Sequence, residues 1–532
     1  MKRTYFWAIV FLVLVGCMDV AEQPALPPLP TPVSTPAPAA VAEPEPEPVQ
    51  EVRLAPSLGG TLRLSMRAPL TLNPLLNEDV TVAKILKLMY EPLVAMDDEL
   101  RPIPHLASLD FAFSGASVVV TIRDGARWSD GEYITSDDLI FSIESLQNAP
   151  TEAIYSRNVE NFASLERLDD WSVRIVFGTI TGGAAYLFNF PIIARHSPHV
   201  SSGPFMFASE NLLDMPTESI TLERNFYTFR DRPFIEAVHV LITPDAETDL
   251  HAFDRGLTDI FLAEVPEWHR HHSVRPVQFA EHLAMNYEFI GFNFARPLPQ
   301  VLEFRQAVAH SIDEEALVSN VFLAHALATR SPVHPASWLY EPGVPTHSYN
   351  IETARLLAAQ AVAAVPLPTD DYGYPKHLTV LVNENNIEGV QIARILVAQM
   401  NAVGLLAELV RLPFEDYIWH LQNGYFDLFI GGYSLSLQPD LRFAFHSESP
   451  DNIMSYSDQE LDRLLEAAAV SGTDSGFYRV MSDIQFHIAR QLPVISLAFR
   501  HSAVVADRRL QGDLLPSVDN IFINVHEWFL TE

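Results

Sequence analysis

The chain has 532 residues, with 67 acidic and 34 basic side chains, and its formal net charge at pH 7 is −33. A protein with this negative charge is poorly suited to bind nucleic acid or an anionic membrane surface, because both are negatively charged and repel it. The chain has one cysteine, which excludes an intramolecular disulfide.

The first residues predict an export signal. Lys2 and Arg3 precede an apolar run at 5–15, which is shorter than the roughly 20 residues that a permanent membrane-spanning helix needs. The letters "LVGC", which end at Cys17, resemble the bacterial lipobox, whose cysteine receives a lipid and becomes the mature N-terminus. We therefore expect residues 1–16 to be a cleaved lipoprotein signal and Cys17 to be lipidated, which leaves no free thiol. The alternative is an ordinary secretory signal with an incidental cysteine.

Residues 17–54 are predicted to be a tether behind the lipid. Between 21 and 51 the chain has no Lys or Arg and few large apolar side chains, so it cannot bury a core. Its many prolines favour an extended chain, which could hold the body up to about 90 Å from the lipid. The rest of the chain is too long for one hydrophobic core and predicts two or three units.

Strands, turns and one capped helix are predicted in the first half. The β-rich runs are 118–123, 172–177 and 236–243. Asp124-Gly125 and Asp130-Gly131 predict tight turns, because glycine tolerates left-handed backbone angles. Ser136 is predicted to cap a helix that has Asp137 and Asp138 in its first turn. Trp128 lies between the turns, and we expect it to anchor the core rather than to contact a ligand.

The second half alternates strands and helices. The predicted order is strand 378–383, helix 387–403 ended by Gly404, strand 405–412, helix 414–422 and strand 425–433. Two successive crossovers of this kind predict a parallel sheet with right-handed connections.

Ligands of such sheets bind beyond the carboxyl ends of the strands. The residues at those ends are Asn383, Asn385, Phe414, Tyr433, Ser434 and Ser436. Aromatic and neutral polar groups suit an organic molecule better than a metal ion. The alternative for each residue is that it only closes a loop.

Motifs for catalysis and cofactor binding are missing from the sequence. It has no Gly-x-Ser-x-Gly elbow, no His-Glu-x-x-His, no Gly-x-Gly-x-x-Gly and no phosphate-binding loop. Hydrolysis by scattered carboxylates or by a Ser/His pair stays open, because neither leaves a local motif. The histidines of "WHRHH" at 268–272 cannot all face one ion from a regular element, and the acidic run 97–99 lacks the spacing of a calcium loop. We expect no metal and no cofactor.

From Gly59 to the C-terminus the order of segments resembles the extracytoplasmic solute-binding proteins of ABC importers, family 5, the peptide/nickel-binding type. The stretch "IRDGARWSDGEYITSDDLIFSI" is similar to the family's most specific block. The pieces "SGPFMF", "ERNFYTFRDRPFIEAVHVLIT", "IGFNFARPLPQVLEFRQAVAHSIDEEALV" and "SPVHP" follow in the family's order. The colinear series carries the resemblance, rather than any one piece.

The resemblance implies an α/β fold of the class II periplasmic-binding-protein type. Two lobes are joined by two hinge crossovers, and the N-terminal lobe holds an extra subdomain. Lobe I would span 55–282, with the extra subdomain at about 75–180. Lobe II would span 283–491, and residues 492–532 would return to lobe I. The block at 121–146 would then be scaffold of the extra subdomain.

Ligand contacts implied by the resemblance fall on Glu78, Asn383, Phe414 and Tyr433. The sequence departs from the family where peptide binders place an aspartate for the α-ammonium, since Ser436 stands there. Leu421 and Ile430 replace two arginines of many members. Loss of a charge-assisted bond costs roughly 1.5–3 kcal/mol, so a free peptide is a doubtful ligand unless Asp440 or Glu78 compensates.

These observations predict a non-enzymatic, monomeric binding protein in the periplasm or cell envelope that touches the membrane only through its lipid. It would hold a peptide or other organic solute and deliver it to an ABC permease complex. Phe414, Tyr417 and Tyr433 would surround the solute, while Asn383 and Ser436 would hydrogen-bond to it. The alternatives are a sensor or interaction partner without a transporter, and a carboxylate hydrolase that uses Glu78.

Overall fold

The computed structural model describes residues 55–111, 116–179, 181–208, 218–263, 275–369 and 371–531. The predicted signal, the tether and the histidines of 268–272 lie outside the described residues. Leu54–Glu532 form one compact unit. Within the described ranges, no helix is long and apolar enough to cross a membrane.

Lobe I contains a four-stranded sheet in the order β1-β10-β9-β8. Its strands are β1 (Thr61–Arg67), β8 (Phe205–Phe207), β9 (Ser219–Arg224) and β10 (Ala237–Thr243). β1 runs parallel to β10, and the other pairs are antiparallel. The alternating residues Leu62, Leu64 and Met66 are buried on one face of β1. The helices α1 (Val80–Leu86) and α3 (Ala246–Asp254) flank this part of the lobe.

The extra subdomain is an antiparallel sheet of order β4-β5-β7-β6 with helix α2 (Ser136–Gln147) beside it. Its strands are β4 (Ala107–Phe111), β5 (Ser117–Ile122), β6 (Phe162–Arg167) and β7 (Ser172–Phe177). Gly125 and Gly131 have positive φ angles of 74° and 92°, as the predicted turns require. Trp128 is fully buried, which confirms its core role. The predicted cap residue was wrong by one position: α2 begins at Ser136, and its N-cap is Thr135, which forms a capping box with Asp138.

Lobe II is built on the strands β14 (Leu378–Asn383), β15 (Ala407–Leu412) and β16 (Leu428–Ser434). β14 pairs in parallel with both β15 and β16, as predicted. The connecting helices are α8 (Ile387–Ala402) and α9 (Phe414–Gln422). The strand predicted from residue 405 begins two residues later.

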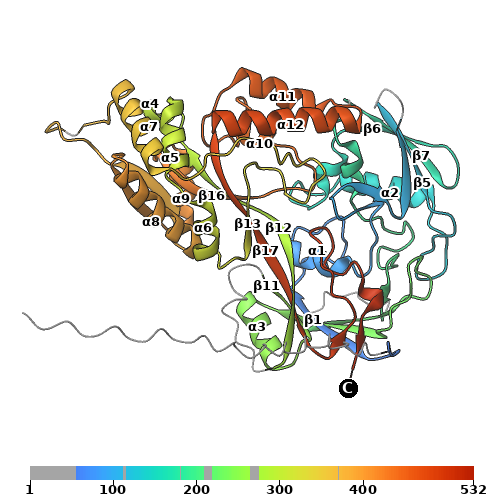
Figure 1. Ribbon diagram of the computed structural model, residues 1–532. Helices are drawn as coiled ribbons and strands as arrows, with labels where there is room; N and C mark the ends of the chain where they lie inside the picture. Colours follow the sequence, from blue (N-terminus) through green and yellow to red (C-terminus); the bar gives the residue numbers. More distant parts are fainter. Residues whose placement is uncertain are drawn as a thin grey trace, which may run out of the picture. The chain divides into compact units, whose positions relative to one another are not determined.

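Two long strands join the lobes. β12 (Val277–Phe292) and β17 (Val494–Asp507) pair antiparallel, with a register shift between Leu283 and Tyr287. At one end β17 pairs with β11 (Ile260–Ala263), and at the other end β12 pairs with β16 (Figure 1). The sheet therefore runs β11-β17-β12-β16-β14-β15, with β13 (Ala326–Ala328) added on β17. This is the two-lobed fold with two hinge crossovers.

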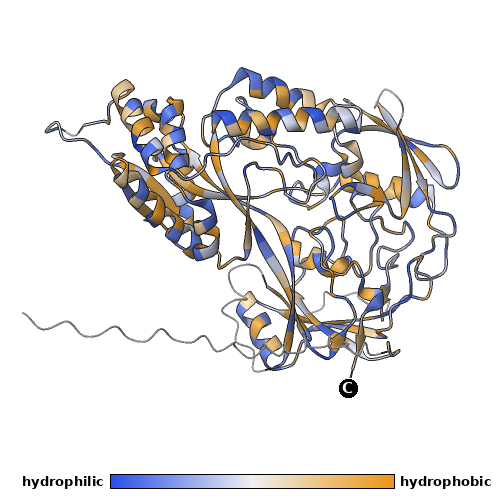
Figure 2. Ribbon diagram, in the orientation of Figure 1, coloured by the Kyte–Doolittle hydropathy of each residue, from blue (hydrophilic) through white to orange (hydrophobic). Residues whose placement is uncertain are grey.

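Shorter elements and helices complete the lobes. The further helices are α4 (Pro297–Gln300), α5 (Leu302–His310), α6 (Glu314–Val321), α7 (Ile351–Ala364), α10 (Arg442–Phe445), α11 (Gln459–Ala469) and α12 (Asp474–Gln491). The remaining elements are β2 (Val94–Met96), β3 (Pro102–Pro104), β18 (Leu510–Gln511), β19 (Phe529–Leu530) and the 3₁₀ helices η1 (Ser156–Val159), η2 (Ala184–Phe188) and η4 (Val525–Glu527). α12 buries Phe477, Met481, Ile484 and Ile488 at spacings of three and four, and Figure 2 shows its polar face alongside.

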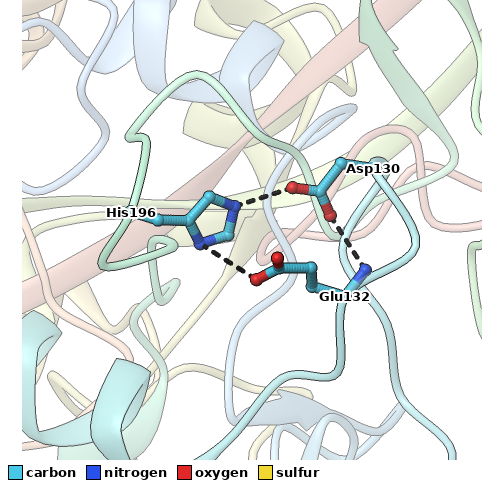
Figure 3. A group of neighbouring side chains, drawn as sticks. All are labelled: Asp130, Glu132 and His196. Atoms are coloured by element: carbon cyan, nitrogen blue, oxygen red, sulfur yellow. Dashed lines mark hydrogen bonds and ion pairs between the residues drawn. The ribbon is translucent and has the colours of Figure 1, made fainter.

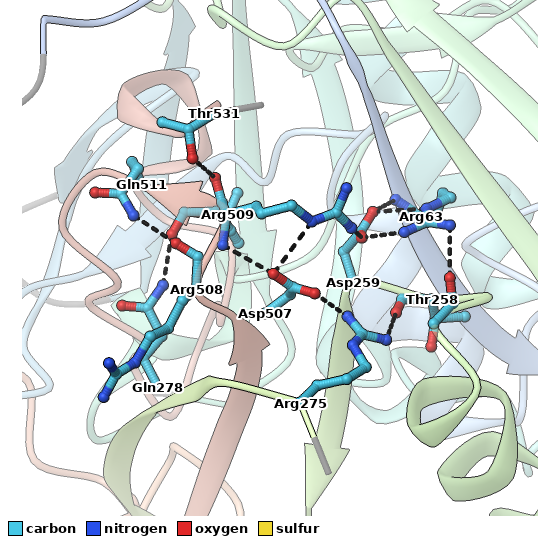
Figure 4. A network of polar contacts seen from close by, with 12 residues as sticks. Arg63, Thr258, Asp259, Arg275, Gln278, Asp507, Arg508, Arg509, Gln511 and Thr531 are labelled. Carbon is cyan, nitrogen blue, oxygen red and sulfur yellow. Dashed lines mark hydrogen bonds and ion pairs between the residues drawn. The ribbon is translucent and has the colours of Figure 1, made fainter. Parts of the chain in front are cut away.

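A network of ion pairs between arginines and aspartates joins the strands of lobe I (Figure 4). The Asp259 carboxylate is 2% exposed and accepts hydrogen bonds from Arg63 at 2.5 Å and from Arg509 at 2.9 Å. Asp507 pairs with Arg509 at 3.3 Å and with Arg275. The network ties β1 to β11 and to the end of β17, so it fastens the returning C-terminal chain to the first strand.

Candidate functional site

The predicted strand-end residues share one edge of the lobe II sheet. β14 lies between β15 and β16 with all three strands parallel, so their carboxyl ends point the same way. Asn383 ends β14 and is half-buried, and its side-chain oxygen accepts from the amide N of the exposed Asn385 at 3.1 Å. Phe414 begins α9 just beyond β15 and is 56% exposed.

Tyr433 lies near the end of β16 among aromatic rings. Its ring centroid is 4.8 Å from that of Phe289 on β12 and 5.0 Å from that of Phe443. Its hydroxyl oxygen is buried and has no hydrogen-bond partner within the described residues. Burial raises the pKa of Tyr433 to about 12, so the hydroxyl keeps its proton and remains a donor. A buried hydroxyl without a partner costs about 1–3 kcal/mol.

Tyr417 is placed differently from Tyr433. It is buried, and its hydroxyl donates to the backbone carbonyl of Ile430 at 2.8 Å. Its hydrogen-bonding group is therefore already used by the chain. Its predicted place beside a ligand stays a prediction.

Ser434 and Ser436 follow Tyr433 and are both exposed. The Ser436 hydroxyl donates to the carbonyl of Gln438. Ser436 also lines a cavity of about 20 Å³ with Met285 and His334, which has room for about one water molecule. A solute that is to enter this cavity therefore needs more space than this arrangement of the lobes gives.

The lobes touch beside this cavity. The Gly182 amide donates to the carbonyl of Ala469 at 2.6 Å, and the Gln438 side chain donates to the carbonyl of Gly182 at 3.4 Å. Trp338 Nε1 donates to the Tyr186 hydroxyl at 2.8 Å. These contacts join the N-terminal part of the chain to lobe II and keep the cavity small.

Glu78 is exposed just before α1. Within the described residues, no hydrogen bond or ion pair joins Glu78 to the strand-end residues. The structure therefore groups the asparagines, Phe414 and the end of β16, but does not link Glu78 to them.

The aspartate and the two arginines that many family members have are replaced in this chain by Ser436, Leu421 and Ile430. Leu421 and Ile430 are buried apolar residues. The Asp440 carboxylate accepts hydrogen bonds from Arg442, from Nη2 at 2.5 Å, from Nε at 3.0 Å and from the backbone N–H at 3.0 Å. Burial opposes ionisation of Asp440, but these bonds prevail and lower its pKa. Asp440 is thus a carboxylate that already has its cation.

Sequence reasoning missed a group of histidines at the hinge. His282 on β12 and His501 on β17 each have a buried Nδ1 that lacks a hydrogen-bond partner in the described part of the chain. His334 lies beside them, with Nε2 3.3 Å from the carbonyl of Leu283. Burial lowers the pKa of His282 and of His334 to about 4, so both rings are neutral at pH 7. In the sequence, the only sign of this group was a single histidine in each of the two strand segments.

A second unpredicted cluster is Asp130, Glu132 and His196 (Figure 3). Nε2 of His196 is 2.7 Å from Asp130, and Nδ1 is 3.7 Å from Glu132. All three side chains are exposed, and they are close enough to share a cation. Each ring nitrogen already faces a carboxylate, so we assign the cluster to holding the Asp130-Gly131 turn.

Comparison with known proteins identifies the class. The model of the middle region of bacterial extracellular solute-binding proteins, family 5, matches residues 101–455. That range covers well over half of the chain. The protein belongs to this family of extracytoplasmic solute-binding proteins of ABC importers.

Individual relatives are distant but colinear. Oligopeptide-binding protein AppA of Bacillus subtilis is 24% identical over 509 residues, which cover 90% of this chain and 93% of that protein. Heme-binding protein A of Haemophilus influenzae is 22% identical over 492 residues, covering 84% and 88%. The crystal structure of the ABC transporter substrate-binding protein CtaP of Listeria monocytogenes has a TM-score of 0.77 at 22% identity, covering 90% of this chain and 100% of that one. This structural likeness shows the fold.

Proposed function

We propose that the protein captures a peptide or another organic solute between its two lobes and passes it to an ABC permease. Family membership and the two crossover strands support this role, because such strands allow hinge closure around a ligand. The relatives differ in what their names say they bind, an oligopeptide in one case and heme in another. The solute therefore has to be argued from this chain.

The Tyr433 hydroxyl is the main observation that supports this proposal. It is buried at the end of β16, next to the crossover strand β12, and it lacks a partner within the described residues. A folded chain rarely leaves such a group unpaired. A ligand acceptor at this place would remove the cost, so the hydroxyl marks where the solute would bind.

The groups around Tyr433 favour a solute that is recognised without a buried charge pair. Ser436 stands where peptide binders have an aspartate, and Asp440 is held by Arg442. Asn383, Asn385, Ser434 and Ser436 offer neutral donors and acceptors, while Phe414 offers an aromatic surface. A modified peptide or a more apolar metabolite fits these groups better than a free peptide ammonium.

The lobes have to separate before a solute of that size can enter. The bonds between Trp338 and Tyr186 and between Gly182 and Ala469 would break and then re-form on closure. Glu78 and Tyr417 would contribute only if the lobes shift relative to this arrangement.

The protein would work as a monomer outside the cytoplasm, without enzymatic activity, metal or cofactor. Its anchor would be a lipid on Cys17, with residues 17–54 as a tether to the periplasmic or surface-exposed body. The length of this proline-rich segment favours a second role, a sensor or interaction partner in the envelope without a transporter.

A thermal-shift screen of the body from residue 55 tests the proposal. The compounds are short peptides, N-blocked peptides, sugars, nickel chelates and small apolar metabolites. A ligand at a hundred times its dissociation constant adds about 2.7 kcal/mol of stability. We expect one class to stabilise the protein and Tyr433→Phe to weaken that effect. If no class stabilises it, the sensor role replaces solute delivery.

A further inference from the structure

Lobe II contains a second pocket that the strand-end residues do not line. Its volume is about 270 Å³, room for about nine water molecules. It lies between the end of α5, the start of α6, the loop 345–349, the end of α12 and the start of β17. Figure 1 shows α5, α6 and α7 grouped in this part of the lobe.

Glu314, the first residue of α6, brings an acid into the pocket. It is partly buried, and within the described residues it has no hydrogen bond and no ion pair. Burial raises its pKa to about 7, while Arg330 opposes this rise and the neighbouring Asp313 and Glu315 add to it. The carboxyl group therefore sits in the pocket without a cation of its own.

Arg330 brings the opposite charge to the same pocket. Its side chain is exposed, and it too has no hydrogen bond or ion pair in the described part of the chain. Glu314 and Arg330 do not pair with each other. The pocket therefore presents a carboxyl group and a guanidinium cation separately. Two unpaired groups of opposite charge that line one pocket match a molecule that carries both charges.

Apolar side chains form a wall of the same pocket. They are Ile312, Ile488, Leu492, Val494 and Ile495. Behind them the Ser496 hydroxyl is bonded to that of Tyr287 at 2.7 Å, so it is not free for a ligand. The wall can bury a small aliphatic side chain.

We propose that this pocket binds a small apolar amino acid as a zwitterion. The ammonium group would bind Glu314, the carboxylate would bind Arg330, and the aliphatic side chain would pack on the wall. This site lies outside the interlobe site and does not depend on what binds there.

Binding at this site should release protons. Because the pKa of Glu314 is raised to about 7, a fraction of its carboxyl groups is protonated at pH 7 in the free protein, and an ammonium beside the group favours its charged form. The other titratable groups at the pocket are Asp313, Glu315, Tyr349 and His347. His347 is bonded to the carbonyl of Ala489 at 3.0 Å, and burial lowers its pKa, with His310 adding to the effect, so it stays neutral.

Isothermal titration of the body from residue 55 with L-leucine tests the inference, using phosphate and Tris buffers at pH 7 and pH 9. We expect binding with a net release of protons at pH 7, and at pH 9 this release should disappear because Glu314 is already charged there. Glu314→Gln should weaken binding about 10- to 100-fold and abolish the proton release. 3-Methylbutylamine and 4-methylpentanoate each lack one charge and should bind at least about tenfold more weakly.

Two controls keep the test specific. Glu303→Gln makes the same charge change on the exposed side of α5, outside the pocket, and should leave leucine binding unchanged. Arg330→Met should weaken leucine binding and leave 3-methylbutylamine binding unchanged, which separates a lost contact from a misfolded lobe. The inference is overturned if leucine gives no heat up to about 10 mM. Equal binding of leucine to Glu314→Gln would overturn it as well.

Discussion

Two sites with buried polar groups, one in each lobe, differ in how those groups are paired. In lobe I the buried Asp259 is bonded to both Arg63 and Arg509. In lobe II the Tyr433 hydroxyl is buried without a partner among the described residues, and Glu314 has no cation there. A buried charge or donor is costly unless it is paired. At these two sites, the paired Asp259 belongs to the framework, and the unpaired Tyr433 hydroxyl marks a place where a ligand can contribute.

Breaking the framework should give the largest effect. Asp259→Asn leaves Arg63 and Arg509 without their charge partner, and we expect the protein to lose about 3 kcal/mol of unfolding free energy. The loss lies at the lower end for buried pairs because Arg509 is partly exposed. Chemical denaturation measures it.

The exposed pair of Arg167 and Asp170 gives the matched control for this change. Its two atoms are 2.5 Å apart, but both side chains are well exposed. Asp170→Asn should therefore cost less than about 1 kcal/mol. Equal losses for the two variants would contradict the distinction between framework and surface.

The hinge histidines should make stability depend on pH. The pKa of His282 is about 4 in the folded chain and about 6.5 when unfolded, so between these values the unfolded chain binds more protons. Stability is then complete above pH 6.5, falls as the pH drops to 4, and levels off below. We expect a loss of about 2 kcal/mol by pH 5.

Denaturation of His282→Gln against pH checks this expectation. The variant should lose less stability than the wild type between pH 7 and pH 5. His251→Gln is the control, because that histidine is 63% exposed on α3. An unchanged pH profile in His282→Gln would show that the ring does not resist protonation.

Changing the contact between the lobes should alter their separation more than their stability. A Cβ atom at Gly182 would lie 1.8 Å from the carbonyl oxygen of Ala468. Gly182→Ala should push the lobes apart, and small-angle X-ray scattering should show a larger radius of gyration. Gly178→Ala is the control, because the nearest atom to its Cβ would be a side-chain oxygen of Asn161 at 3.2 Å, with no atom closer. An unchanged radius in both variants would mean that this contact does not set the spacing.

The sequence predicted local elements and missed long-range pairings. β14 matched its predicted bounds because apolar alternation and the following Asn cap are local signals. The partners of Asp259 lie 196 and 250 residues away along the chain, so no local pattern could reveal them. The strand β12 mixes charged and apolar residues over 16 positions, which hid it from a search for alternation.

The candidate site divides in the same way. The strand ends could be named because a parallel sheet puts its carboxyl ends at one edge. Their individual roles could not, since both Tyr417 and Tyr433 are tyrosines near that edge, and only the fold decides which hydroxyl is bonded. The pocket around Glu314 draws on five separate segments, so no local pattern in the sequence could reveal it.

Those two tyrosines offer the finest test of the comparison, because each can lose one hydroxyl and nothing else. Tyr417→Phe removes a donor that is bonded to the Ile430 carbonyl, which leaves a buried acceptor, and should cost about 1 kcal/mol. Tyr433→Phe removes a buried hydroxyl that has no partner in the described residues, so stability should stay the same or rise slightly. Denaturation of the free protein measures both. A loss in Tyr433→Phe equal to that in Tyr417→Phe would mean that the Tyr433 hydroxyl already has a partner, and the strongest support for the interlobe site would be gone. If only Tyr417→Phe loses stability, the Tyr433 hydroxyl does not contribute to folding. It is then available to bind a ligand.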